Sequence, residues 1–65
     1  MNLAEAITIG KSAGGKTLAG IFVTSDGSTY KNPNLEKLKT HAKKDSLTLY
    51  DVEAEKIIYN PRSKK

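Results

Sequence analysis

The sequence predicts a small single α+β domain in which antiparallel β-hairpins pack on one short helix. Residues 17–25 form an apolar, β-branched run that ends at the turn dipeptide Asp26-Gly27. Residues 33–44 carry apolar side chains at helical spacing, and residues 47–59 return to a strand-like pattern. A strand, a hairpin, a helix and a second hairpin are therefore expected in that order.

The first element is expected to be a strand at about residues 5–9, because the chain alternates weakly there and ends in Ile7-Thr8-Ile9. The preceding Leu3-Ala4-Glu5-Ala6 is equally compatible with a helical turn. Residues 10–16, which are rich in glycine, are expected to form a loop that leads into the next strand.

The Asp26-Gly27 dipeptide predicts a hairpin, because both central positions of a type I′ turn need positive φ. With a two-residue loop, Val23 lies opposite Tyr30, and these two side chains share the better core face with Ile21. Phe22 then lies on the opposite face of the hairpin, where it needs separate cover or a binding partner.

A helix of about three turns follows the hairpin. Either Asn32 caps it with Pro33 at the first helical position, or Asn34 is the cap. Asp45-Ser46 is expected to end it. One face of the helix carries an apolar stripe that consists of Leu35, Leu38 and Ala42.

The segment after the helix has two interpretations. The preferred one is a hairpin in which residues 47–51 turn through Glu53-Ala54-Glu55 into a strand at 56–59. The other is a short helix over residues 52–58, because no glycine marks the turn. Pro61 is expected to stop either element.

Residues 10–17 match the phosphate-binding loop pattern G-x-x-x-x-G-K-[ST]. Such a loop works when a helix follows it and directs its positive N-terminus at the phosphates. Here the strand-like residues 18–25 follow, and 65 residues are too few for several βαβ units of about 30 residues each. Nucleotide binding is therefore a remote alternative, and a flexible connection between two strands is expected.

Length and composition indicate the extent of the domain, its stability and its location. The single domain is expected at residues 1–61, with a basic flexible tail at 62–65. A domain of this size without cysteine has a small core and no disulfide, which favours a partner: a second copy in a homo-oligomer, a larger protein assembly or a nucleic acid. The sequence shows no signal peptide or transmembrane run, so we expect no membrane association and an intracellular location.

The net charge of +4 is unevenly distributed. Residues 33–44 hold four lysines and one acid, residues 45–61 hold four acids and one lysine, and the tail is basic. A polarised surface of this kind guides an oppositely charged partner. The residues expected to contact a partner are Phe22, Lys37, Lys43, Lys44, Arg62, Lys64 and Lys65.

A small basic nucleic-acid-binding protein is the alternative. The lysines and the tail would contact phosphates, and a platform for base stacking would consist of Tyr30, Tyr50 and Tyr59. Because the chain has one arginine and few aromatic residues, this interpretation stays second.

The sequence predicts no catalytic residue, metal ligand or cofactor. His41 has no serine, cysteine or carboxylate at convincing spacing and is expected to pack or hydrogen-bond on the flank of the helix. Asp51, Glu53 and Glu55 alternate and would share one solvated face of a strand.

One resemblance adds to this interpretation. The run from Phe22 to Gly27, followed by Tyr30 and by His41-Ala42-Lys43-Lys44, resembles a pattern in small uncharacterised proteins of bacteriophages and mobile elements. It covers about residues 20–44. The resemblance implies a small accessory protein without enzymatic activity. The sequence predicts a non-enzymatic protein–protein interaction module. If it is a phage protein, the resemblance implies that this module is a minor virion or assembly component, located in the virion.

Overall fold

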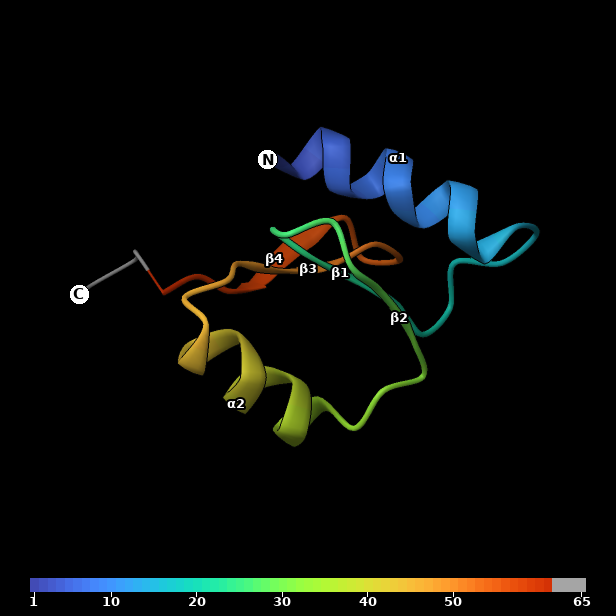
Figure 1. The fold of residues 1–65 in the computed structure, drawn as a ribbon. Helices are drawn as coiled ribbons and strands as arrows, with labels where there is room; N and C mark the ends of the chain where they lie inside the picture. The colour runs from blue at the N-terminus through green and yellow to red at the C-terminus, as the bar shows by residue number, and fades with distance from the viewer. Residues whose placement is uncertain (62–65) are drawn as a thin grey trace.

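A computed structural model describes residues 1–61 as an α+β domain with two helices and a four-stranded antiparallel sheet. The strand order in the sheet is β2-β1-β3-β4, and the helices lie on opposite faces of it (Figure 1). The predicted fold class is confirmed, although two helices are present where one was expected. The elements are α1 (Leu3–Gly14), β1 (Ile21–Thr24), β2 (Thr29–Lys31), α2 (Leu35–Lys44), β3 (Leu49–Asp51) and β4 (Lys56–Tyr59).

Both faces of the sheet are covered, and this explains why all four residues of β1 are buried. Alternate side chains of a strand point to opposite faces, so β1 serves two small cores. The core under α1 consists of Ala6, Ile21, Val23, Tyr50 and Val52. The core under α2 consists of Phe22, Leu38, Ala42 and Leu49.

The predicted strand at residues 5–9 is wrong, because this segment lies inside α1. Asn2 and Glu5 form a capping box, in which the Asn2 side chain accepts from the Glu5 amide at 2.9 Å and the Glu5 carboxylate accepts from the Asn2 amide at 3.0 Å. Ala6 then packs on the sheet, fully buried. Burial of one helical face outweighs the β-propensity of Ile7-Thr8-Ile9.

The hairpin at Asp26-Gly27 is confirmed, but its predicted register is wrong by one residue. The loop has three residues, since the Thr24 amide donates to the Ser28 carbonyl at 3.0 Å, and Gly27 has a φ of 91°. Phe22 therefore lies opposite Tyr30. A shift of one residue moves a side chain to the other face, so Tyr30 faces α2.

Asp26 organises this loop. Its carboxylate accepts from the Thr24 hydroxyl at 2.5 Å and from the Ser28 amide at 3.1 Å. These hydrogen bonds, the one from Thr24 above all, hold the pKa of Asp26 below its ordinary value of 3.8. The Thr24 side chain is fully buried, so this bond also satisfies its hydroxyl.

The second half of the chain agrees with its prediction more closely. Asn34, one of the two expected caps, accepts from the Lys37 amide at 3.2 Å and begins α2. The preferred hairpin is confirmed, with β3 and β4 joined by a turn and no helix over 52–58. Glu53 and Glu55 lie in that turn, so the expected strand face shared with Asp51 is absent. The predicted tail at 62–65 lies outside the described residues.

Candidate interaction surface

A groove between α2 and the end of β2 is the main candidate site. Its volume is about 360 Å³. The chain turns from β2 into α2 through Asn32, which has a φ of 52°, and this turn sets the groove between the two elements. The lining is mostly apolar and consists of Tyr30, Pro33, Asn34, Lys37, Leu38 and His41.

The register of the first hairpin places Tyr30 in this groove. Opposite Phe22, the Tyr30 ring packs half-buried against the core under α2. Had the loop contained two residues, Tyr30 would face α1 instead. Sequence reasoning missed this position, because the Asp-Gly dipeptide alone does not distinguish a two-residue from a three-residue loop.

The expectation that Phe22 presents an exposed face to a partner is wrong. Phe22 is 9% exposed and packs with Leu38, Ala42 and Leu49. Its cover is α2, so the side chain serves the core and is not available for docking. Arg62, Lys64 and Lys65, also predicted to contact a partner, lie outside the described residues.

The predicted lysines of α2 are all exposed, but they divide between two sides of the helix. Lys37 and His41 line the groove, and helical spacing continues their row to Lys44. Lys43 lies with Lys39, four residues earlier, on another side of the helix. The groove therefore has a basic row beside an apolar floor, and Lys43 is not part of it.

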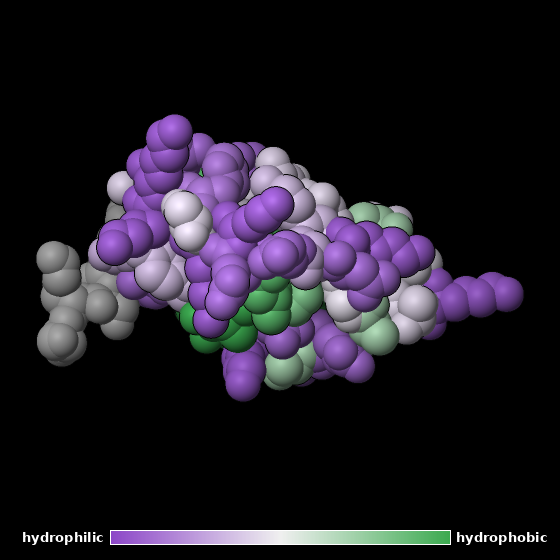
Figure 2. Space-filling model, turned by 90° about the horizontal axis from the view of Figure 1, so that it is seen from below, coloured by the Kyte–Doolittle hydropathy of each residue, from purple (hydrophilic) through white to green (hydrophobic). Residues whose placement is uncertain are grey.

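Viewed from the α2 side, hydrophilic side chains cover most of the surface, and a small hydrophobic area is exposed among them (Figure 2). α2 itself carries four lysines and one glutamate. Since exposed charges of one sign attract a partner of the other sign, this side suits an acidic partner.

The three tyrosines do not form a stacking platform. Tyr50 is 3% exposed in the core under α1, and its hydroxyl donates to the Met1 carbonyl at 3.0 Å. Tyr30 and Tyr59 lie on the two edge strands, on the side of α2, with β1 and β3 between them. A run of bases would find no continuous aromatic surface here.

The expectation that no carboxylate lies at suitable spacing from His41 is wrong. The Nδ1 atom of His41 lies 3.5 Å from Oδ2 of Asp45, the C-cap of α2 four residues later, and both side chains are exposed. The pair has the spacing of a contact between residues i and i+4 at the exposed end of a helix. Within residues 1–61, no three His, Asp or Glu side chains come together as metal ligands do.

The segment matching the phosphate-loop pattern has the reverse of the usual arrangement. Residues 10–14 belong to α1, Gly15 ends that helix with a φ of 66°, and a strand follows. The pattern therefore covers a helix C-terminus, where carbonyl groups and the negative end of the helix dipole disfavour phosphate. The glycines have structural roles: Gly10 and Gly14 approach the side chains of Val52 and Ile21.

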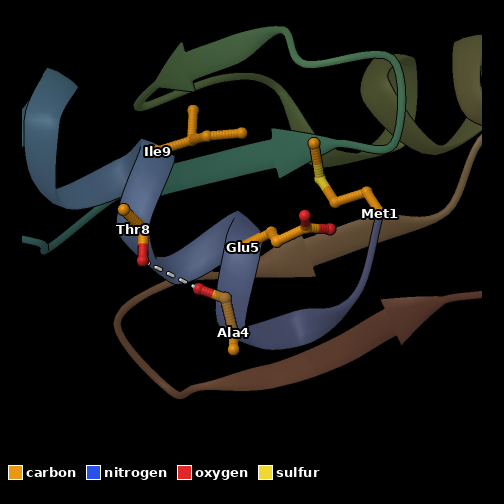
Figure 3. A pocket seen from close by; sticks show the side chains of 5 residues that line it. All are labelled: Met1, Ala4, Glu5, Thr8 and Ile9. Atoms are coloured by element: carbon orange, nitrogen blue, oxygen red, sulfur yellow. Dashed lines mark hydrogen bonds between the residues drawn. The ribbon is translucent and has the colours of Figure 1, made fainter.

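A second hollow of about 580 Å³ lies on the flank of α1 (Figure 3). The Thr8 hydroxyl donates to the Ala4 carbonyl at 3.0 Å, and the Glu5 carboxylate is held in the capping box. Its polar groups are thus engaged within the helix, and Met1 and Ile9 supply only apolar surface.

A third, more polar hollow of about 490 Å³ lies where the N-terminus meets the strand ends. The Thr48 amide donates to the Ser25 hydroxyl oxygen at 3.0 Å, and Tyr50 binds the Met1 carbonyl. These bonds join segments distant in sequence, which gives the polar side chains a structural role.

Comparisons with protein families, with curated proteins and with solved structures find no match to this chain. Neither helix in the described part of the chain is long and apolar enough to cross a membrane. The class that the fold and its surface define is a small α+β domain with a basic helix beside an apolar groove.

Proposed function

We propose that this chain is a non-enzymatic interaction module that binds an acidic segment of a partner protein on its α2 side. The observation that carries the proposal is the apolar groove at Tyr30, Pro33 and Leu38, bordered by the basic row of α2. An apolar side chain of the partner would enter the groove, and acidic neighbours would face Lys37 and Lys44.

The energies involved indicate a weak contact for one segment alone. Burying one leucine-sized side chain contributes about 1.5–3 kcal/mol, and each exposed ion pair contributes about 0.2–1 kcal/mol. With two ion pairs the sum is about 2–5 kcal/mol, which corresponds to a dissociation constant between tens of millimolar and a few tenths of a millimolar. A short isolated segment is therefore expected to bind weakly, and multivalent presentation would raise the apparent affinity.

The resemblance to phage and mobile-element proteins supplies a setting for such a module. In a virion or an assembly complex many copies of each protein lie close together, so weak contacts add. A role as a minor virion or assembly component is part of this proposal, and so is the absence of enzymatic activity.

The test is an amide-resolved NMR titration of the full chain with a short peptide rich in Asp and Glu around one central tryptophan. The expected result is a set of saturable shifts at Tyr30, Leu38 and His41 that weaken as salt is added. Replacing the tryptophan of the peptide by alanine should weaken binding by about tenfold or more, because the apolar anchor is lost.

Lys37→Glu should weaken binding by about threefold to tenfold. Lys39→Glu is the matched control, because it makes the same charge change on the same helix away from the groove. Equal losses in the two variants would mean that net charge alone, and not the groove, attracts the peptide. Tighter binding of a single-stranded oligonucleotide than of the peptide would favour nucleic acid and overturn the proposal.

A further inference from the structure

The edge of the sheet formed by β4 is a second exposed apolar surface. Ile57 lies opposite Tyr50 on the face that α1 covers, yet Tyr50 is 3% exposed and Ile57 is 45% exposed. The core under α1 draws its sheet residues from β1 and β3. Ile57 lines the polar hollow beside Met1 and Leu3, so the N-terminal segment lies near this face of β4 but leaves the Ile57 side chain about half exposed.

We propose that two copies of the chain associate through β4, with the two strands antiparallel about a two-fold axis. A hollow of about 560 Å³ lies along this strand and is lined by its apolar residues with Asn60. A second copy would add its own β4 to the edge and cover Ile57 with apolar surface. The surface is distinct from the α2 groove, so the two proposals stand or fall separately.

The two edges of the sheet differ in how well they are protected from pairing. β2 has three residues, carries Lys31 and is followed by Asn32-Pro33, all features that discourage a further strand. β4 has three consecutive apolar residues, Ile57-Ile58-Tyr59, after a single lysine. Strand addition is therefore expected at β4.

The side-chain pattern selects the antiparallel arrangement. An axis through Ile57 places Ile57 of both copies side by side on the same face and Lys56 opposite Ile58 of the second copy. A parallel pair in register would instead place Lys56 of one chain beside Lys56 of the other. Like charges at that distance oppose pairing.

Charge along the chain favours the same orientation. Glu53 and Glu55 lie in the turn that precedes β4. A parallel pair in register would bring these acidic turns of the two copies together, whereas an antiparallel pair places them at opposite ends of the contact. Repulsion between like charges therefore also favours the antiparallel pair.

The contact is expected to be weak. The register of β4 on β3 shifts at Leu49/Tyr50, so the strand is irregular as well as short. A contact between two four-residue strands is small and belongs to the class of transient interfaces. The dimer should therefore appear with rising protein concentration rather than persist on dilution.

Analytical ultracentrifugation of the full chain from low-micromolar to millimolar concentration tests this inference. The expected result is a reversible monomer–dimer equilibrium. Ile57→Lys should weaken it about tenfold or more, and Ile57→Thr, which keeps strand propensity, should weaken it less. Leu35→Lys is the matched control, because Leu35 is a similarly exposed aliphatic residue, at 40%, on another side of the molecule.

Cross-linking tests the register independently of the association constant. The chain has no cysteine, so Ile57→Cys creates a single thiol. Opposed residues lie about 4.5–5.5 Å apart between Cα atoms, within the range of a disulfide. Oxidised glutathione should join two copies of Ile57→Cys several times faster than two copies of Leu35→Cys. A monomer at all concentrations, or equal cross-linking of both variants, would overturn the inference.

Discussion

Gly10 of α1 lies so close to Val52 that a β-carbon on the glycine would be 2.5 Å from Cγ2 of the valine. This contact joins the N-terminal helix to the end of β3 and closes the core under α1. The space is filled by the side chain of Val52, which is fully buried. Glycine at this position is therefore a packing requirement.

Gly10→Ala should destabilise the domain by about 1–3 kcal/mol through overpacking. The gain in helix propensity, about 1 kcal/mol, offsets only part of that cost. Urea unfolding followed by circular dichroism measures the change. Ser12→Ala, at an exposed position of the same helix, should be neutral or slightly stabilising.

A double-mutant cycle locates the cause. Combined with Val52→Ala, the Gly10→Ala change should cost less than it does alone, because the smaller side chain leaves room for the methyl group. A variant Gly10→Ala as stable as the wild type would contradict the packing argument.

Phe22→Ala should destabilise the domain by about 3–5 kcal/mol, since it empties the centre of the core under α2. For a chain of this size that loss is enough to populate the unfolded state at room temperature. Thermal unfolding monitored in the far ultraviolet tests this, with Phe22→Leu expected to retain the fold. A Phe22→Ala variant that stays fully folded and loses only partner binding would mean that Phe22 contacts the partner and does not stabilise the core.

Asp26 should make the stability depend on pH at the acidic end. Because the folded-state pKa is lowered, its stabilising effect is complete above the ordinary pKa of 3.8 and is lost as pH falls through the folded-state pKa. The group is exposed, so the effect is small, at about 0.5 kcal/mol. Asp26→Asn keeps the turn and removes the charge, which makes it the reference variant.

The measurement is the difference in unfolding free energy between the wild type and Asp26→Asn across pH. The difference should be constant near neutrality and shrink once the pH drops below about 4. A difference that grows on acidification would mean that the carboxylate destabilises the folded state.

The segment 10–17 should show no nucleotide affinity. Its lysines are exposed at a helix C-terminus, where no row of free amide groups faces a phosphate. Calorimetry with magnesium and ATP or GTP should give no binding heat, and Lys16→Ala should behave as the wild type does. Saturable binding that disappears in Lys16→Ala but not in Lys11→Ala would reinstate the phosphate-loop interpretation.

Local signals account for the parts of the fold and site that the sequence predicted correctly. The Asp26-Gly27 turn and the exposed Lys37 each depend on a few neighbouring residues, and so does the cap of α2, which the sequence left open between Asn32 and Asn34. The capping box at Asn2 and Glu5 was an equally local signal for α1. The prediction of a strand rested instead on the alternation of Ile7-Thr8-Ile9.

By itself, the sequence indicated the position of the Asp26-Gly27 turn, the two candidate caps of α2, the preferred second hairpin and the uneven charge, because these depend on backbone preferences and side chains close in the chain. Only the tertiary structure decided that residues 3–14 are helical, since Ala6 and Gly10 must meet β1 and β3 to bury that face. The tertiary structure also decided which residues line the groove beside α2. One residue of register, set by a three-residue loop, moved Tyr30 to the side of α2 and gave Phe22 its cover.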